Sequence, residues 1–262
     1  MSTDKKLTIV ARYNEDISWT EKLPGDVVIY NKGKDFPWDT PRVDVENFGR
    51  ESESYVRGIL EFYEKLPEYD SVVFLQGDPF HHSKKLFDKL DCKLDHSFAY
   101  LGDYNAYLET GNQLSIYGSS THIIDIFWNK MVENTPKLEE KENFKYSEMT
   151  NLSFNITLND GSIENRVSEL TEVFYFCEIM KIPYKNAKYN WDCGAQYRVS
   201  TKSILNKSFY WWNSLHNLLH YTTVKLNSNI LPYILERTWP LVWNHDERRP
   251  ITGHFYGENP KL

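Results

Sequence analysis

The chain has 262 residues, of which 40% are hydrophobic and 15% aromatic. This composition excludes a disordered protein and supplies enough apolar side chains for one large core. The net charge of −7 argues against a nucleic-acid-binding protein, because such proteins need a basic face to displace counterions from phosphates. Three cysteines without metal-type spacing, and a start without a long apolar segment, predict a cytoplasmic protein with no signal peptide and no membrane segment.

Three short apolar segments near the start have the same sequence pattern, and they occupy residues 6–13, 26–33 and 71–78. Each segment is rich in β-branched residues, is nearly continuous in hydrophobicity, and ends abruptly in polar residues. Such runs are typical of strands that are buried on both faces of a parallel sheet.

An amphipathic helix is predicted between the second and third strands, with Asn47 as its N-cap and its end before Pro67. Its apolar stripe contains Tyr55, Ile59 and Leu66. A strand, a helix and a strand in this order indicate a right-handed parallel crossover.

The rest of the chain is predicted to mix short strands with helices. Strands are expected at 98–101, 113–117 and 195–200, a short helix at 83–90, and an exposed charged loop at 136–146. Helices are expected at 163–180, 203–221 and 230–243, and Pro240 should kink the last one or end it early. The fold class is therefore α/β, with a mostly parallel central sheet flanked by helices and a helical C-terminal part.

Polar residues follow all three N-terminal strands, and open α/β sheets bind ligands at the carboxyl ends of their strands. The N-terminus of the crossover helix at the same edge is a natural site for an anion. We expect this edge to hold a diphosphate through cationic and amide side chains, namely Arg12, Asn14, Lys32, Asn47, Arg50 and Gln76. The alternative is that the basic residues pair with nearby carboxylates and only close the edge of the sheet.

The end of the third strand carries one carboxylate and two histidines, Asp78, His81 and His82. These residue types ligate metals, and Asp78 with His82 is the pair expected to hold a divalent cation such as Mn or Mg. Neighbouring histidines point apart in regular structure, so both cannot easily reach one metal. The alternative is a turn closed by Asp78 and Pro79, with a histidine packed locally.

Two later segments combine small, polar and aromatic residues. In 191–200, small residues before a strand allow a ligand to approach the backbone closely. In 235–239, Glu236 precedes Arg237 on a helix rich in large apolar residues. A carboxylate in that setting can have a raised pKa and act as a general base, or it can be a buried partner of the arginine.

A family resemblance is carried by six segments, which occur in the order ARYNED, YNKG, N-x-GRE, FLQGDPFHH, GAQYRVS and LERTW. They resemble a family catalogued as a domain of unknown function. Members of that family are similar to nucleotide-sugar glycosyltransferases of the GT-A type. The resemblance spans residues 7–245. It implies a Rossmann-like GT-A fold in one domain, 1–262, with a donor-binding half over 1–105 and an acceptor-binding half over 106–262. It also implies transfer of a hexosyl or pentosyl group from a nucleotide-diphosphate sugar to a hydroxyl of a glycan or glycoprotein.

The later segments look like the acceptor half of metal-independent GT-A enzymes that attach GlcNAc branches. By position, this resemblance implies Glu236 as the base that takes the acceptor proton, and Asp78 as a contact to the donor sugar or a metal. The acceptor side would contain Trp191, Gln196, Arg237 and Trp239. Most GT-A enzymes carry Asp-x-Asp where this chain has a single carboxylate, Asp78.

That departure leaves other functions open. One rival is a metal-dependent hydrolase built on Asp78, His81 and His82. The other is a carbohydrate-binding protein that kept the fold without catalysis.

Overall fold

The structure, a computed structural model, describes residues 4–35, 41–94, 97–103, 105–109, 155–157, 163–165, 176–177, 179–183, 188–192, 194–225, 230–243 and 254–255. In 105–109, 155–157, 163–165, 188–192 and 254–255, and at residue 230, the description is limited to the backbone. The strand predicted at 113–117 and the loop predicted at 136–146 lie outside the described residues.

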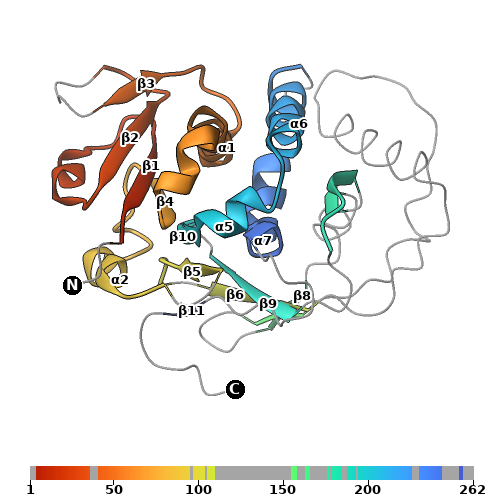
Figure 1. Cartoon of the computed structure of the whole chain (residues 1–262). Coiled ribbons are helices and arrows are strands. Elements are labelled where there is room, and N and C mark those ends of the chain that lie inside the picture. Colours follow the sequence, from red (N-terminus) through yellow and green to blue (C-terminus); the bar gives the residue numbers. More distant parts are fainter. Residues whose placement is uncertain are drawn as a thin grey trace, which may run out of the picture.

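The central feature is a mixed sheet flanked by helices, which places the chain in the α/β class (Figure 1). The strand order is β11-β5-β10-β4-β1-β2-β3. The bounds of these strands are β1 Lys6–Arg12, β2 Asp26–Asn31, β3 Arg42–Asp44, β4 Ser71–Gln76, β5 Phe98–Tyr100, β10 Tyr197–Ser200 and β11 His254–Phe255. Two further pairs of described strands form separate two-stranded sheets. They are β6 (Asn105–Glu109) with β9 (Lys188–Asp192), and β7 (Asn155–Thr157) with β8 (Ile163–Asn165).

The three predicted N-terminal strands are confirmed, and β1 lies between β2 and β4 in parallel with both. Their side chains alternate between two buried clusters, one on each face of the sheet. In β4, for example, Val72 and Phe74 join one cluster, whereas Val73 and Leu75 join the other. Burial on both faces explains why these strands are nearly continuous in hydrophobicity. Because the strands are parallel, their polar ends emerge at one edge.

Helix α1 (Arg50–Phe62) covers one face of the sheet, and the predicted stripe of Tyr55, Ile59 and Leu66 is completely buried. A 3-10 helix at Tyr63–Glu68 continues α1 and contains Pro67, so the chain remains helical past the predicted stop. On the opposite face lie a 3-10 helix at Ser18–Lys22 and the short helix α2 (Leu86–Asp91).

The C-terminal helices pack beside α1 on the same face of the sheet (Figure 1). They are α5 (Thr201–Leu205), α6 (Phe209–His220) and α7 (Ile230–Trp243), and a π-helical turn follows α6 at Tyr221–Lys225. Trp243 is at the centre of this packing, because its ring stacks on Trp239 at 4.6 Å and on Phe74 of β4 at 5.3 Å between ring centroids. Both tryptophans are fully buried.

Two expectations about helices are wrong. Residues 163–165 of the helix predicted over 163–180 form strand β8, although Phe176, Cys177, Ile179 and Met180 are helical. The helix predicted over 203–221 is instead divided between α5 and α6. The division occurs because Ser208 caps α6, its side chain accepting a hydrogen bond from the backbone N–H of Trp211. Pro240 lies inside α7, which does not end early but continues to Trp243.

Candidate functional site

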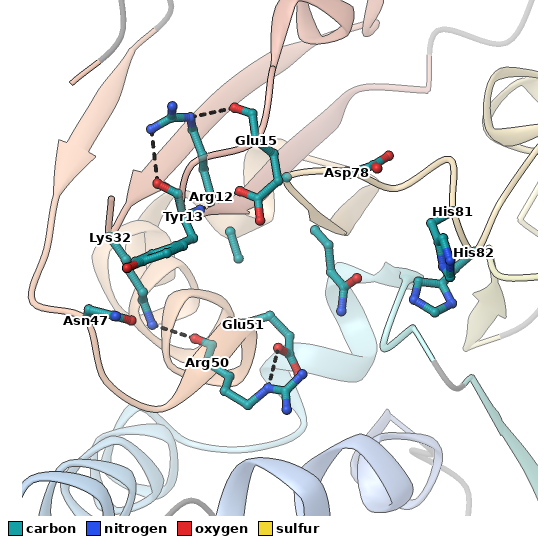
Figure 2. Close-up of a pocket in the computed structure, with 13 residues that line it drawn as sticks. Arg12, Tyr13, Glu15, Lys32, Asn47, Arg50, Glu51, Asp78, His81 and His82 are labelled. Carbon is teal, nitrogen blue, oxygen red and sulfur yellow. Dashed lines mark hydrogen bonds and ion pairs between the residues drawn. The ribbon is translucent and has the colours of Figure 1, made fainter. Parts of the chain in front are cut away.

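A pocket of about 490 Å³ opens at the edge where β1, β2 and β4 end (Figure 2). Its walls come from the three strand ends and from the N-terminus of α1. The lining residues are Ala11, Arg12, Tyr13, Glu15, Lys32, Asn47, Arg50, Glu51, Gln76, Gly77, Asp78, His81 and His82. Eight of the residues singled out from sequence are among them: Arg12, Lys32, Asn47, Arg50, Gln76, Asp78, His81 and His82.

Arg12 lines the pocket but uses its guanidinium to join the strand ends. Its Nε donates to the carbonyl oxygen of Glu15, and its Nη1 donates to Asn31 Oδ1 at 2.5 Å and to the carbonyl oxygen of Lys34 at 2.7 Å. The side chain is almost fully buried. The structure therefore favours the alternative to phosphate binding for Arg12, which holds the edge of the sheet together.

Asn14, unlike Arg12, does not line the pocket, and its side chain is exposed. Its Oδ1 accepts a hydrogen bond from the backbone N–H of Lys34 at 2.9 Å. Asn14 therefore connects the ends of β1 and β2, and the predicted contact with a phosphate is not supported.

Lys32 is likewise bound by the protein itself. Its Nζ donates to the carbonyl oxygens of Phe48 and Arg50 and lies 2.9 Å from Glu53 Oε2. Burial lowers the pKa of the Lys32 ammonium, and the charge of Glu53 opposes that shift. Because three protein oxygens surround its three N–H groups, Lys32 braces α1 against the end of β2, and the predicted contact with a phosphate is not supported.

Glu53 is the fully buried centre of this brace. Besides Lys32, it contacts Arg57 at 2.5 Å and His216 of α6 at 3.2 Å. Burial alone would raise the pKa of Glu53, but the hydrogen bond with His216 and the charges of Lys32 and Arg57 hold it below its ordinary value. The first turn of α1 is thereby tied to both β2 and α6.

Arg50 differs from Arg12 and Lys32, because its guanidinium remains half-exposed at the pocket. It is the first residue of α1 and follows Gly49, and both have positive φ, 52° and 64°. Gly49 takes the N-cap position that we predicted for Asn47, and no side chain in the described part of the chain caps this end of the helix. Asn47 is exposed and lines the pocket beside it. The α1 N-terminus, with its partial positive charge, therefore opens into the pocket.

The predicted metal site at the end of β4 is not assembled. The carboxylate of Asp78 is exposed, accepts the N–H of Phe80 at 3.2 Å, and points away from the two imidazoles in Figure 2. Among the described residues, no three His, Cys, Asp or Glu side chains are grouped so that they could hold a metal ion. The pairing of Asp78 with His82 around a divalent cation is thus not supported.

His82 instead packs against the later Gly-Ala-Gln segment. A Cβ atom on Gly194 would lie only 2.8 Å from both Cβ and Cγ of His82, so glycine is required for this close approach. Burial lowers the pKa of the His82 imidazole, the neighbouring His81 lowers it further, and Asp78 opposes the shift. At neutral pH this imidazole is uncharged and can accept a proton.

The predicted acceptor-side residues lie behind the pocket wall or away from it. Gln196 is completely buried and donates from Nε2 to the carbonyl oxygen of Pro79, and Trp239 is completely buried in the tryptophan cluster. Neither presents a surface to an acceptor, which corrects both predictions. Glu236 and Arg237 lie on α7 with 3.9 Å between Arg237 Nη1 and Glu236 Oε2, and neither lines the pocket. The side chain of Trp191 lies outside the described residues.

Several residues at or beside the pocket were not predicted as site residues, among them Tyr13, Glu51 and Tyr233. The ring of Tyr13 is 52% exposed beside the end of β1. Glu51 lies 3.5 Å from Arg50 Nε, and Tyr233 of α7 lies below the guanidinium of Arg50, with 4.6 Å between Cζ and the ring centroid. Tyr13 is the last residue of a predicted strand, so its position carried a signal. The pairing of Arg50 with Tyr233 depends on how α1 and α7 pack, and the sequence offers no signal for it.

Comparison with known proteins finds no matching family model, no matching curated protein and no matching solved structure.

A search of the helices among the described residues finds none that is long and apolar enough to span a bilayer.

Proposed function

We propose that this protein is a glycosyltransferase that transfers a sugar from a nucleotide-diphosphate donor, bound in the pocket at the ends of β1, β2 and β4, to a hydroxyl acceptor. The observation that carries the proposal is the opening of the α1 N-terminus, with the half-exposed Arg50, into that pocket. Its volume of about 490 Å³ lies within the range for small-molecule and cofactor sites. The family resemblance of the sequence, including its GT-A relationship, points to the same class of substrate.

The diphosphate is assigned to the α1 N-terminus. Unpaired N–H groups of a first helical turn attract anions, and Arg50 adds a charged donor of hydrogen bonds. The exposed ring of Tyr13 provides a face on which a nucleobase can stack. Lys32 and Arg12 contribute by fixing the walls, since their own N–H groups already face protein oxygens.

The acceptor hydroxyl is assigned to the side of the pocket formed by His82. As the hydroxyl oxygen bonds to the anomeric carbon, the bond from that carbon to the diphosphate breaks and the nucleoside diphosphate leaves with the electron pair. A neutral imidazole nitrogen of His82 takes the proton of the hydroxyl. Glu236, the base implied by resemblance, does not line the pocket. No step is assigned to a metal ion, because the described residues do not group ligands for one.

The first test is binding. Uridine, guanosine and thymidine diphosphate sugars should each be titrated while the melting temperature is followed, with the corresponding free sugars in parallel. A ligand at 100 times its dissociation constant adds about 2.7 kcal/mol to the free energy of unfolding. Stabilisation by free sugars alone would instead indicate a non-catalytic carbohydrate-binding protein, and no stabilisation by any nucleotide sugar would overturn the proposal.

The second test is substitution of Arg50. Arg50→Ala should weaken binding of the stabilising nucleotide sugar by roughly tenfold or more, because a charged hydrogen bond to phosphate contributes about 1.5–3 kcal/mol. Lys65→Ala is the matched control, since Lys65 is an exposed cation in the 3-10 helix that follows α1. Equal affinities of the two variants would place the diphosphate elsewhere.

A further inference from the structure

Arg50 and Tyr233 form a contact between the start of α1 and α7 at the rim of the pocket. Cζ of Arg50 lies 4.6 Å from the centroid of the Tyr233 ring. Tyr233 as a whole residue is 45% exposed. Tyr233 is therefore an aromatic residue at the surface, and its described ring contact is with Arg50, a half-exposed cation that lines the pocket.

This contact leaves the hydrogen-bonding capacity of Arg50 intact. A guanidinium over an aromatic face is attracted by the ring quadrupole and does not use an N–H group for that attraction. The other partner of Arg50 is Glu51, whose Oε2 lies 3.5 Å from Nε. Among the described residues no acceptor approaches the terminal amino groups of Arg50. Arg12 is the opposite case, because its Nε and Nη1 already donate to oxygens of the protein.

An arginine at a surface loses side-chain entropy when it is fixed in one rotamer. Contacts that restrict it before a ligand arrives reduce that loss at the moment of binding. Glu51 restricts the guanidinium at Nε and Tyr233 restricts it at its face. The two together hold the side chain so that the terminal amino groups are available to the pocket.

We propose that Tyr233 is a positioning residue that holds the Arg50 guanidinium ready for the diphosphate of the ligand. This inference rests on the proposed function, since it requires that Arg50 binds a diphosphate. It assigns to α7 a role at the donor-binding side of the pocket. The sequence pointed instead to Glu236, Arg237 and Trp239 of the same helix for the acceptor side.

The probes are inorganic pyrophosphate and uridine diphosphate, and the measurement is calorimetric titration of the full chain. Tyr233→Leu removes the aromatic face and should weaken binding of both probes by roughly two- to fivefold, the effect of an exposed cation–π contact. Tyr233→Phe keeps the face and should bind like the wild type. Tyr210→Leu is the matched control, because Tyr210 on α6 is 81% exposed and its ring contact is with Phe209.

A double-mutant cycle separates positioning from a general structural effect. In the Arg50→Ala background, Tyr233→Leu should cause no further loss of affinity, because the residue through which it acts is absent. Tyr233→Gln is the second variant if the leucine variant does not fold, as judged by circular dichroism and melting temperature.

Three results would overturn the inference. Tyr233→Leu could bind both probes like the wild type while Arg50→Ala binds weakly, and then the proposed function stands and the role of Tyr233 does not. Tyr233→Leu could weaken binding equally in both backgrounds, and then it acts without Arg50. The wild type could bind neither probe, and then both the inference and the diphosphate site are wrong.

Discussion

Lys32 Nζ lies 2.9 Å from Glu53 Oε2, and these two side chains are 5% and 0% exposed. The pair connects the end of β2 to the first turn of α1, so it fixes one wall of the pocket. Charges this deeply buried need their partners, because an isolated buried charge is strongly disfavoured.

Removing the ammonium should therefore affect stability more than binding. We expect Lys32→Met to lower the free energy of unfolding by about 3–5 kcal/mol, since it removes the buried cation that pairs with Glu53 Oε2. Urea denaturation measures the change. Lys34→Met is the control, because that side chain is exposed, and it should change stability by less than about 0.5 kcal/mol. A Lys32→Met protein of wild-type stability with lost nucleotide affinity would restore Lys32 as a phosphate ligand.

The buried carboxylate also predicts how stability depends on pH. The pKa of Glu53 is below its ordinary value of 4.5, although burial opposes this, because of His216, Lys32 and Arg57. A carboxyl with a depressed folded-state pKa contributes stability that is present above the unfolded value and is lost as pH falls through the folded value. The stability advantage of the wild type over Glu53→Gln should thus be full at pH 7 and shrink below pH 4.5. Urea titrations across that range test it, and a pH-independent difference would contradict it.

The identity of the general base can be decided by comparing two substitutions. Under the proposed function, His82→Gln should lower the transfer rate by roughly 10²–10⁴-fold, the usual contribution of a general base. Glu236→Gln should leave the rate close to that of the wild type, because Glu236 does not line the pocket.

The pH profile provides the control for that comparison. The pKa of His82 lies below the ordinary 6.5, mainly because of burial, so the wild-type rate should fall only as pH drops below 6.5. This acid limb should be absent in His82→Gln. If Glu236→Gln loses activity and His82→Gln keeps both its rate and its acid limb, the base implied by resemblance is the correct one.

A smaller change tests the position of His82. Alanine at Gly194 would place a Cβ 2.8 Å from Cβ and Cγ of His82 and would force the imidazole to move. We expect Gly194→Ala to reduce transfer by roughly 10–100-fold, because small displacements of a reacting group are costly. Nucleotide affinity, measured by melting temperature, should not change, since Arg50 lies at the other side of the pocket (Figure 2). A parallel loss of nucleotide affinity would indicate general damage to the pocket.

The N-terminal strands and α1 could be predicted because each carries a strong local pattern. The strand at 163–165 could not, because its three residues, Ile-Glu-Asn, are too few to show an alternating pattern. The division between α5 and α6 could not, because the polar residues 206–208 interrupt an otherwise helical pattern only briefly. Strand β3, which spans only Arg42–Asp44, is too short to show a pattern. The antiparallel insertion of β10 between β4 and β5 depends on contacts that are distant in sequence.

The residues of the site likewise include some that could be predicted from the sequence and some that could not. The sequence predicted that the strand ends meet, because parallel strands place their carboxyl ends at one edge. It did not distinguish Arg50 from Arg12 and Lys32, since the difference lies in which oxygens surround each cation. Glu53 and His216, which lie in different helices, determine the surroundings of Lys32 only after the helices have packed.

Strand β10 has a consequence for how the chain assembles. It pairs with β4 across a separation of 127 residues, as measured by the hydrogen bond from Arg198 to Ser71. During synthesis, β4 can pair with β1 early, but its other edge has no strand until residue 200 is available. An apolar strand with an open edge recruits other chains. Fragments that end before β10 should therefore aggregate, and the intact chain should fold slowly because the long loop between β4 and β10 must close.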